Sequence, residues 1–117
     1  MRHQKTRHKL SRTASHRKAL LRNLCKEVIE HERIKTSEAK AKAVKPEIEQ
    51  LITLAKQGTL ASRRRIIAEL PNEPLVIDKL INEIAPKYGD RNSGYTRLVK
   101  LGLRNGDAAP MVQLELV

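Results

Sequence analysis

The sequence predicts a mixed α/β fold of the α+β type, in which helices come first and a small sheet is completed near the C-terminal end. Apolar residues recur at helical spacing through most of residues 15–85, whereas Val112, Leu114 and Leu116 alternate with polar residues, as in a strand with one buried face. The chain has 117 residues and neither Phe nor Trp, so we expect one domain with an aliphatic core. The expected element order is α-β-α-α-α-β-β.

The first helix is expected to begin at Ser15, whose hydroxyl is suited to cap it. Its apolar residues fall on one stripe, which consists of Leu20, Leu21, Leu24, Cys25, Val28 and Ile29. Lys18, Arg22 and Lys26 follow one another at intervals of four residues and are expected to form a basic ridge on the other side. A brief strand over residues 32–35 comes next.

The second helix is expected to start after Thr36 or Ser37, either of which can act as its N-cap. The apolar spacing continues across Pro46, so this proline is expected to kink one helix rather than separate two. Gly58 supplies the C-terminal stop, because glycine readily adopts the left-handed conformation in which many helices end.

Two further helices are expected before the sheet. The third covers residues 60–70 and ends at Pro71. Its inward-facing residues are expected to be Ile66, Ile67 and Leu70. The fourth is capped by Asn72 and closes before Pro86. Its apolar stripe consists of Val76, Ile77, Leu80, Ile81 and Ile84.

The C-terminal part reads as a β-hairpin. Its first strand is expected over residues 95–101 and its second over residues 112–116, where apolar and polar side chains alternate. The Asn105-Gly106 pair between them is typical of a tight turn, because both residues tolerate positive φ.

Positive charge is concentrated at the N-terminal end. The first 26 residues hold nine of the 24 Lys and Arg residues and no Asp or Glu. The other 15 basic residues face all 13 acidic ones, so nine of the eleven net positive charges lie in the first 26 residues. Such a run repels itself unless a polyanion lies alongside, and nucleic acid is the commonest polyanion in a cell.

Residues 1–14 combine high charge with no apolar period, so we expect a disordered basic arm in front of a single globular domain over residues 15–117. The alternative is an organellar transit peptide, which is also rich in Arg and poor in acidic residues. Met1 and Leu10 are the only large apolar residues in this stretch. They are too few for an amphipathic import helix, which favours the arm.

The composition argues against several classes of function. Tyr88 and Tyr95 are the only aromatic residues, whereas RRM and OB-type proteins stack unpaired bases on many rings. Recognition through phosphates and shape is therefore expected. No apolar run approaches the ~18 residues typical of a membrane span.

No pattern indicates a catalytic, cofactor or metal site. His31-Glu32 begins an HExxH zinc motif, but Lys35 occupies the position of the second His. Cys25 lies on an apolar stripe and is interpreted as a core residue rather than a nucleophile. Asp90 and Asp107 lie beside glycines in basic loops, where turn chemistry explains them better than the metal site of a nuclease.

A second basic group surrounds the C-terminal loops and strand, where Arg forks and exposed backbone amides suit phosphate oxygens. It consists of Arg91, Asn92, Arg97, Lys100, Arg104 and Asn105. Arg97 and Arg104 lie on a stiffer scaffold than the arm, so we expect forked phosphate contacts from both. The triplet Arg63 to Arg65 fits either a solvated helix face or a phosphate contact.

Several blocks resemble the bacterial large-subunit ribosomal protein seventeen family. They are the opening MRH, HRKALLRNL at residues 16–24, ERIKTSEAKAKAVKPEIEQLITLAKQG at 32–58, APKYGDRNSGYTRLVKLG at 85–102 and RNGDAAPMVQLELV at 104–117. They occur in the family's order and cover nearly the whole chain, which makes the likeness far more specific than any single motif.

The resemblance implies two layers and a role as a structural constituent of the large ribosomal subunit, without enzymatic activity. It also implies large-subunit rRNA and neighbouring ribosomal proteins as partners, a position near the exit of the nascent-peptide tunnel, and a cytoplasmic, ribosome-bound location. No membrane or small-molecule substrate is expected. The residues expected to bind RNA are those of the C-terminal basic group together with Arg2, His3, Lys5, Arg7, Lys9, Arg12, His16, Arg17, Lys18 and Arg22.

Two other functions compete with this one. A DNA-binding regulator could use the third and fourth helices as a helix-turn-helix, but the recognition helix would carry Glu73, Asp78 and Glu83 against Lys79 alone. Such a helix repels the phosphates that border a major groove. A metal-dependent nuclease would need an acidic cluster, which the sequence does not provide.

Overall fold

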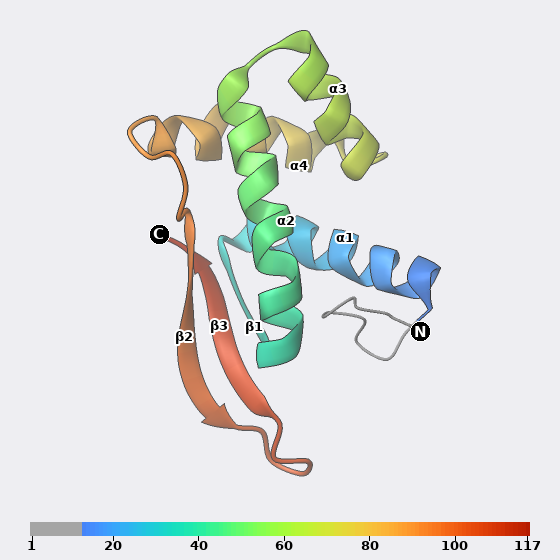
Figure 1. Cartoon of the computed structure of the whole chain (residues 1–117), viewed down its shortest axis with the longest axis vertical. Coiled ribbons are helices and arrows are strands. Elements are labelled where there is room, and N and C mark those ends of the chain that lie inside the picture. Colours follow the sequence, from blue (N-terminus) through green and yellow to red (C-terminus); the bar gives the residue numbers. More distant parts are fainter. Residues whose placement is uncertain (1–12) are drawn as a thin grey trace, which may run out of the picture.

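The computed structural model describes residues 13–117, which contain four α-helices and one three-stranded antiparallel sheet (Figure 1). Helix α1 spans Ala14–His31, and its N-cap is Thr13, whose hydroxyl accepts a hydrogen bond from the backbone N–H of His16. The prediction that Ser15 caps the helix is wrong, because Thr13 has the extended backbone that a cap requires and Ser15 is already helical. The buried stripe of α1 follows the predicted spacing.

Strand β1, Arg33–Ser37, begins after Glu32, which ends α1 in a left-handed conformation. Ser37 caps α2, Glu38–Gln57, by accepting from the backbone N–H of Lys40. The prediction of one continuous helix is confirmed, since α2 runs through Pro46. Gly58 ends it with φ of 67°, as expected.

Helix α3, Leu60–Glu69, begins with a capping box between Thr59 and Ser62. Ile66 and Leu70 are buried as predicted, but Ile67 is 45% exposed. The helix packs through a narrow face, and Ile67 lies about 100° around the axis from Ile66. The burial of Ile66 therefore does not extend to Ile67.

Helix α4, Pro74–Lys79, continues as a π-helical turn, Leu80–Ile84, and a 3₁₀ turn, Ala85–Tyr88. Asn72 does not cap it, because Asn72 has φ of 64° and Glu73 is the N-cap residue. The helical path does not close before Pro86 either. Proline cannot donate to an α-helical ladder. The α-helix instead gives way to the wider π-helical turn before Ala85 and then to the tighter 3₁₀ turn that contains Pro86.

Strands β2, Thr96–Leu103, and β3, Pro110–Leu116, form the predicted antiparallel hairpin, with its turn at Asn105-Gly106. The sheet order is β1-β3-β2. The last strand of the chain is therefore central, and it pairs with β1 from Arg33 opposite Glu115 to Ser37 opposite Met111. This long-range pairing joins β1 to the hairpin and was not predicted.

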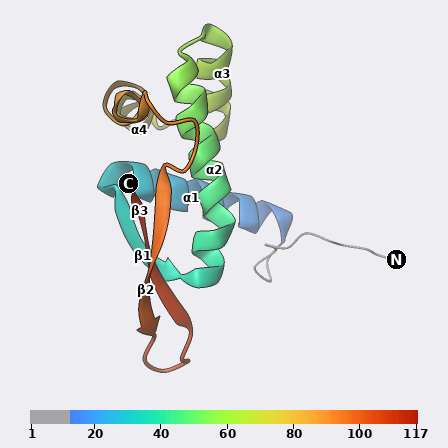
Figure 2. The same ribbon diagram turned by 60° about the vertical axis from the view of Figure 1, so that its left-hand side comes forward.

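The helices and the sheet form the two layers that were predicted. Figures 1 and 2 show the strands on one side of α1 and the N-terminal half of α2, while α3 and α4 lie beyond the end of the sheet. Val112 and Leu114 of β3 are buried against the helices together with Val28, Val44 and Ile48. The hairpin tip extends past the start of α2 (Figure 1), and this placement leaves its loop open to a partner.

Candidate nucleic-acid interface

The N-terminal half of α1 carries the predicted basic residues that fall in the described part of the chain. His16 and Lys18 are exposed, while Arg17 and Arg22 are half-buried. None of the four forms an ion pair with a carboxylate of residues 13–117. The other predicted basic residues of this region lie outside the described residues; they are Arg2, His3, Lys5, Arg7, Lys9 and Arg12.

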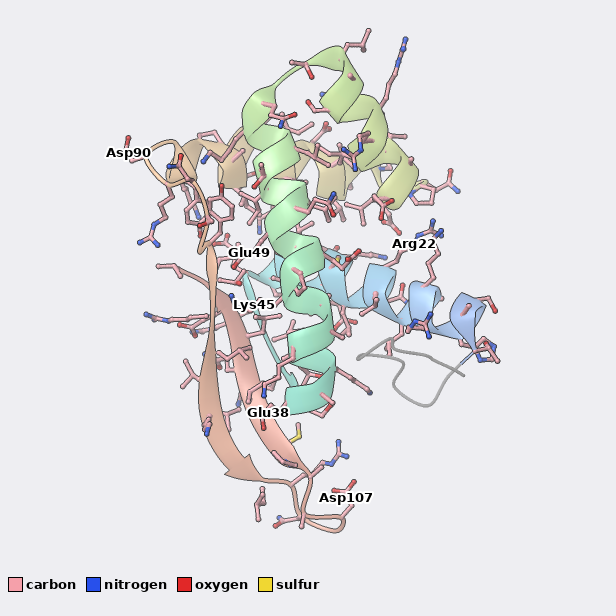
Figure 3. The ribbon with its side chains drawn as sticks, viewed as in Figure 1. Arg22, Glu38, Lys45, Glu49, Asp90 and Asp107 are labelled. Carbon is pink, nitrogen blue, oxygen red and sulfur yellow. The ribbon has the colours of Figure 1, made fainter. Side chains whose placement is uncertain are left out.

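The spacing had predicted that the basic ridge of α1 faces away from the protein. In the structure, it does not. Arg22 rises from α1 toward the end of α3 (Figure 3), and the Nε of Arg22 is buried without a hydrogen-bond partner within residues 13–117. Lys26 pairs with Glu73 at 3.3 Å, just before α4. The ridge therefore borders a groove between α1 and α3.

Both arginines of the hairpin are paired with carboxylates. The Nε of Arg97 donates to Glu115 on the neighbouring strand at 2.5 Å. Arg104 places its fork on Asp107, with Nε to Oδ1 at 3.1 Å and a terminal nitrogen to Oδ2 at 2.6 Å. Arg104 therefore points its fork at Asp107, whereas Arg97 uses only its Nε on Glu115 and its terminal nitrogens donate no hydrogen bond within residues 13–117.

The pKa values of these carboxyl groups record the pairing. Hydrogen bonds from Arg104 and from the backbone N–H of Ala109 lower the pKa of Asp107 to about 2. Hydrogen bonds from Gln113 and Arg97 lower the pKa of Glu115. Both carboxylates are charged at neutral pH, so each cancels one positive charge of the hairpin.

Arg91 and Asn92 lie on the exposed loop between the 3₁₀ turn and β2, and this loop is tied to α2. The hydroxyl of Tyr95 donates to the carbonyl of Asn92 at 3.0 Å, and Lys56 donates to that hydroxyl at 3.1 Å and to the carbonyl of Arg91. Lys56 also lies 5.0 Å from the centre of the Tyr95 ring. Sequence reasoning missed Lys56 as the anchor, because its partners are some 35 residues away along the chain.

Within residues 13–117, the structure separates the predicted residues from one another. The first half of α1, the loop around Asp90 and the hairpin tip around Asp107 lie at separate corners of the molecule (Figure 3). Even Arg97 and Lys100 are separated, since Arg97 shares a row with Glu115 and Lys100 shares one with the buried Val112, on the opposite face of the sheet. One compact patch is therefore not formed.

Two basic residues that sequence reasoning missed join Arg97 on the outer face of the sheet. Arg33 lies in the same row as Arg97, with Glu115 between them, and Lys35 lies two residues further along β1 on the same face. Both are exposed. The alternation of Arg33, Ile34, Lys35 and Thr36 was the available signal, since it places the two cations on one face of any strand.

Comparison with known families gives the chain its relatives. The family model for ribosomal protein L17 matches residues 20–117. The chain belongs to this family. A large ribosomal subunit protein bL17 of Desulfitobacterium hafniense (strain DSM 10664 / DCB-2) is 54% identical over 109 residues, which cover 93% of this chain and 96% of the relative. The resemblance of the sequence blocks is therefore confirmed.

Two further relatives of the L17 family agree in extent. A large ribosomal subunit protein bL17 of Symbiobacterium thermophilum is 54% identical over 93% of this chain and 96% of its own length. One from Rhodopseudomonas palustris (strain BisB18) is 49% identical over 100% of this chain and 86% of its own length. The similarity to that relative includes the basic opening residues, which the family model leaves out.

The described residues contain neither a metal-binding cluster nor a membrane-spanning helix. Among residues 13–117, no three His, Cys, Asp or Glu side chains lie close enough together to hold a metal ion. None of the helices in the same part of the chain is both long and apolar enough to cross a membrane.

Proposed function

We propose that the chain is a non-catalytic structural constituent of the large ribosomal subunit that binds large-subunit rRNA through phosphate and shape contacts. The observation that carries the proposal is the 54% identity, over 93% of the chain, to relatives named as large ribosomal subunit proteins. The family match over residues 20–117 includes the sheet, the hairpin, helices α2 to α4 and most of α1.

The charge distribution supports rRNA as the ligand. Nine of the eleven net positive charges lie in the first 26 residues, and the basic residues of the first half of α1 carry no carboxylate partner within residues 13–117. Cations that are not neutralised by their own protein release counterions from a nucleic-acid backbone when they bind it. Residues 1–14 act in this proposal as the basic arm of a domain over residues 15–117.

Family membership also supports the finer parts of the proposal. These are a position near the exit of the nascent-peptide tunnel, contacts with neighbouring ribosomal proteins, and a cytoplasmic, ribosome-bound location. The proposal includes no small-molecule substrate, cofactor or membrane.

A DNA-binding regulator is a weaker candidate on structural grounds. Lys79 is the basic residue of the would-be recognition helix, and its ammonium group donates to the carbonyl of Glu30 at 2.7 Å and pairs with Glu32 at 3.3 Å. It is therefore turned toward α1. The α-helical part of α4 is also only six residues long, which is short for an element that must span a major groove.

Sedimentation tests the proposal directly. An affinity-tagged full-length chain, expressed in a bacterium, is expected to co-sediment with large subunits in a sucrose gradient. It should stay bound to the subunit at moderate salt and dissociate from it as the salt concentration rises, because phosphate contacts weaken with ionic strength. A chain that remains at the top of the gradient in intact lysate, while other large-subunit proteins sediment, contradicts the proposal.

A further inference from the structure

The structure contains a hollow between α1, α2 and α3, of whose lining the proposed function uses only the basic residues of α1. We call it the three-helix hollow. Its volume is about 230 Å³, below the ~300 to 1,000 Å³ of pockets that take drug-sized molecules. It is lined by Lys18, Leu21, Arg22, Cys25, Glu47, Gln50, Leu51, Leu54, Arg65, Glu69 and Leu70.

The floor of the three-helix hollow is apolar. Leu51, Leu54 and Leu70 are buried members of the hydrophobic core, and Cys25 lies among them with 4% of its surface exposed. Burial, followed by the nearby charges of Glu47 and Glu69, raises the pKa of Cys25 to about 12. The thiol therefore stays neutral and contributes an apolar surface, and a bare phosphate has nothing to bind on this floor.

The rim combines three cations with two carboxylates. Lys18 and Arg65 are exposed, and the Nε of Arg22 is buried without a hydrogen-bond partner within residues 13–117. The enclosed Nε cannot reach an occupant of the hollow, but the terminal nitrogens of Arg22 donate no hydrogen bond within residues 13–117 and remain as donors for one. Glu47 and Glu69 oppose a second anion at the same point and accept hydrogen bonds from N–H groups instead.

We propose that the three-helix hollow receives one unstacked rRNA base that carries an exocyclic amino group, with Lys18 and Arg65 on its flanking phosphates. The leucine floor contacts the face of the base. Arg22 stacks on the other face of the base or donates to the edge of the base. Glu47 and Glu69 accept from the amino group of the base. The net positive rim matches the charge of an RNA strand.

This inference rests on the proposed function and adds a recognition mode to it. The protein has only two aromatic rings, and Tyr88 and Tyr95 are buried 5.2 Å from each other. Stacking on aromatic side chains is therefore not offered in residues 13–117. A guanidinium plane above aliphatic side chains is the alternative that RNA-binding proteins use for single bases.

Two matched tryptophan variants test the proposal. Gln50 is exposed at the rim, so Gln50→Trp fills the mouth of the hollow without disturbing the core. Gln57 is exposed on the same helix and outside the hollow, so Gln57→Trp is the control. Binding of the full-length variants to large-subunit rRNA is measured together with base reactivity toward dimethyl sulfate for adenine and cytosine and kethoxal for guanine.

The wild type and Gln57→Trp should protect one unpaired base, and Gln50→Trp should expose it and bind about tenfold more weakly, which is the size expected for one lost stacking contact. An unchanged footprint in Gln50→Trp, at unchanged affinity, overturns the inference. Loss of a neighbouring protein from the particle with an unchanged rRNA footprint also overturns it, because the occupant is then a protein. A wild type that fails to bind rRNA refutes the proposed function itself, so the two failures are distinguishable.

Glu69→Lys separates a base from a phosphate. Glu69 is exposed and forms no ion pair within residues 13–117, so the substitution should leave the fold intact. If a base occupies the hollow, its protection should fall although the protein has become more basic. If the footprint persists and affinity rises, the occupant is a phosphate and the inference is wrong.

Discussion

The first half of α1 and the β2–β3 hairpin both carry basic side chains, but they differ in whether those side chains are paired with carboxylates. Arg17 and Lys18 of α1 have no carboxylate partner within residues 13–117, whereas Arg97 and Arg104 of the hairpin are paired with Glu115 and Asp107. A count of basic residues therefore overstates what the hairpin offers to RNA. We infer that affinity comes mainly from the N-terminal region, and that the hairpin contributes position and shape.

Among the variants considered, removal of the arm should have the largest effect on the affinity for rRNA and on its salt dependence. Deletion of residues 1–12 removes five cations, namely Arg2, Lys5, Arg7, Lys9 and Arg12. If each neutralises a phosphate, the slope of log affinity against log salt should flatten by about 3.5 to 4.5, at ~0.7 to 0.9 per contact. The melting temperature should stay nearly unchanged, because Leu10 is the only large apolar residue among residues 2–12.

A chain of unchanged length is the control for the deletion. Replacement of the same five cations by Gln should flatten the slope equally, since charge rather than length carries the effect. An unchanged slope in both variants would place those side chains in solvent.

Release of the hairpin arginine should have a smaller effect of opposite sign. Asp107→Asn keeps an oxygen for the N–H of Ala109 but removes the charge that holds Arg104. If the hairpin tip lies against rRNA, affinity should rise a few-fold and the salt slope should steepen by about one contact. Filter binding at several salt concentrations measures both, and no change at all would place the tip away from RNA.

The junction of the hairpin with α2 should matter for stability rather than affinity. Thr96 donates to Glu49 at 2.7 Å, and Lys45 pairs with the same oxygen at 3.0 Å (Figure 3). Hydrogen bonds to charged groups contribute about 1.5 to 3 kcal/mol, so Thr96→Val should lower the free energy of unfolding by an amount at the low end of that range. Affinity for rRNA should change less than twofold.

The pH dependence of that stability has a defined sign. Burial alone raises the pKa of Glu49, but the hydrogen bonds from Thr96 and Lys45 outweigh it and leave the pKa below the ordinary value of 4.5. The stabilisation is therefore present above pH 4.5 and is lost as the pH falls through the lowered pKa of the folded state. The difference between wild type and Thr96→Val in urea unfolding should shrink at acidic pH, and a constant difference would show that Glu49 is not the partner.

The helices and the hairpin could be predicted because their signals are local. The stripes of α1 and α2 depend only on spacing along the helix, and the Asn105-Gly106 turn depends on two neighbouring residues. The start of α4 was predicted one residue too early, with Asn72 instead of Glu73 as the N-cap, and Pro74 in the first turn, where proline is favoured, was the unused signal. The capping signal of Asn72, whose side-chain amide oxygen can accept at a helix start, was misleading. Asn also tolerates the positive φ of the turn before the helix.

The candidate site was less predictable, because its charges are set by partners far away in sequence. Arg97 meets Glu115 only through the hairpin register, and Arg33 joins their row only because β1 pairs with β3. The three-helix hollow likewise needs side chains from α1, α2 and α3 together. Composition identified where basic residues lie along the chain, but it could not show which of them the fold neutralises.

The salt dependence of two matched variants tests the central comparison most directly. Arg17→Gln removes one cation of α1 that has no carboxylate partner within residues 13–117, whereas the double variant Arg104→Gln with Asp107→Asn removes a neutral pair from the hairpin tip. Full-length protein is titrated against large-subunit rRNA at several salt concentrations. We expect the slope to fall by ~0.7 to 0.9 for Arg17→Gln and to stay unchanged for the double variant. The opposite result, with a flattened slope only in the double variant, would contradict it and place the dominant phosphate contacts on the hairpin.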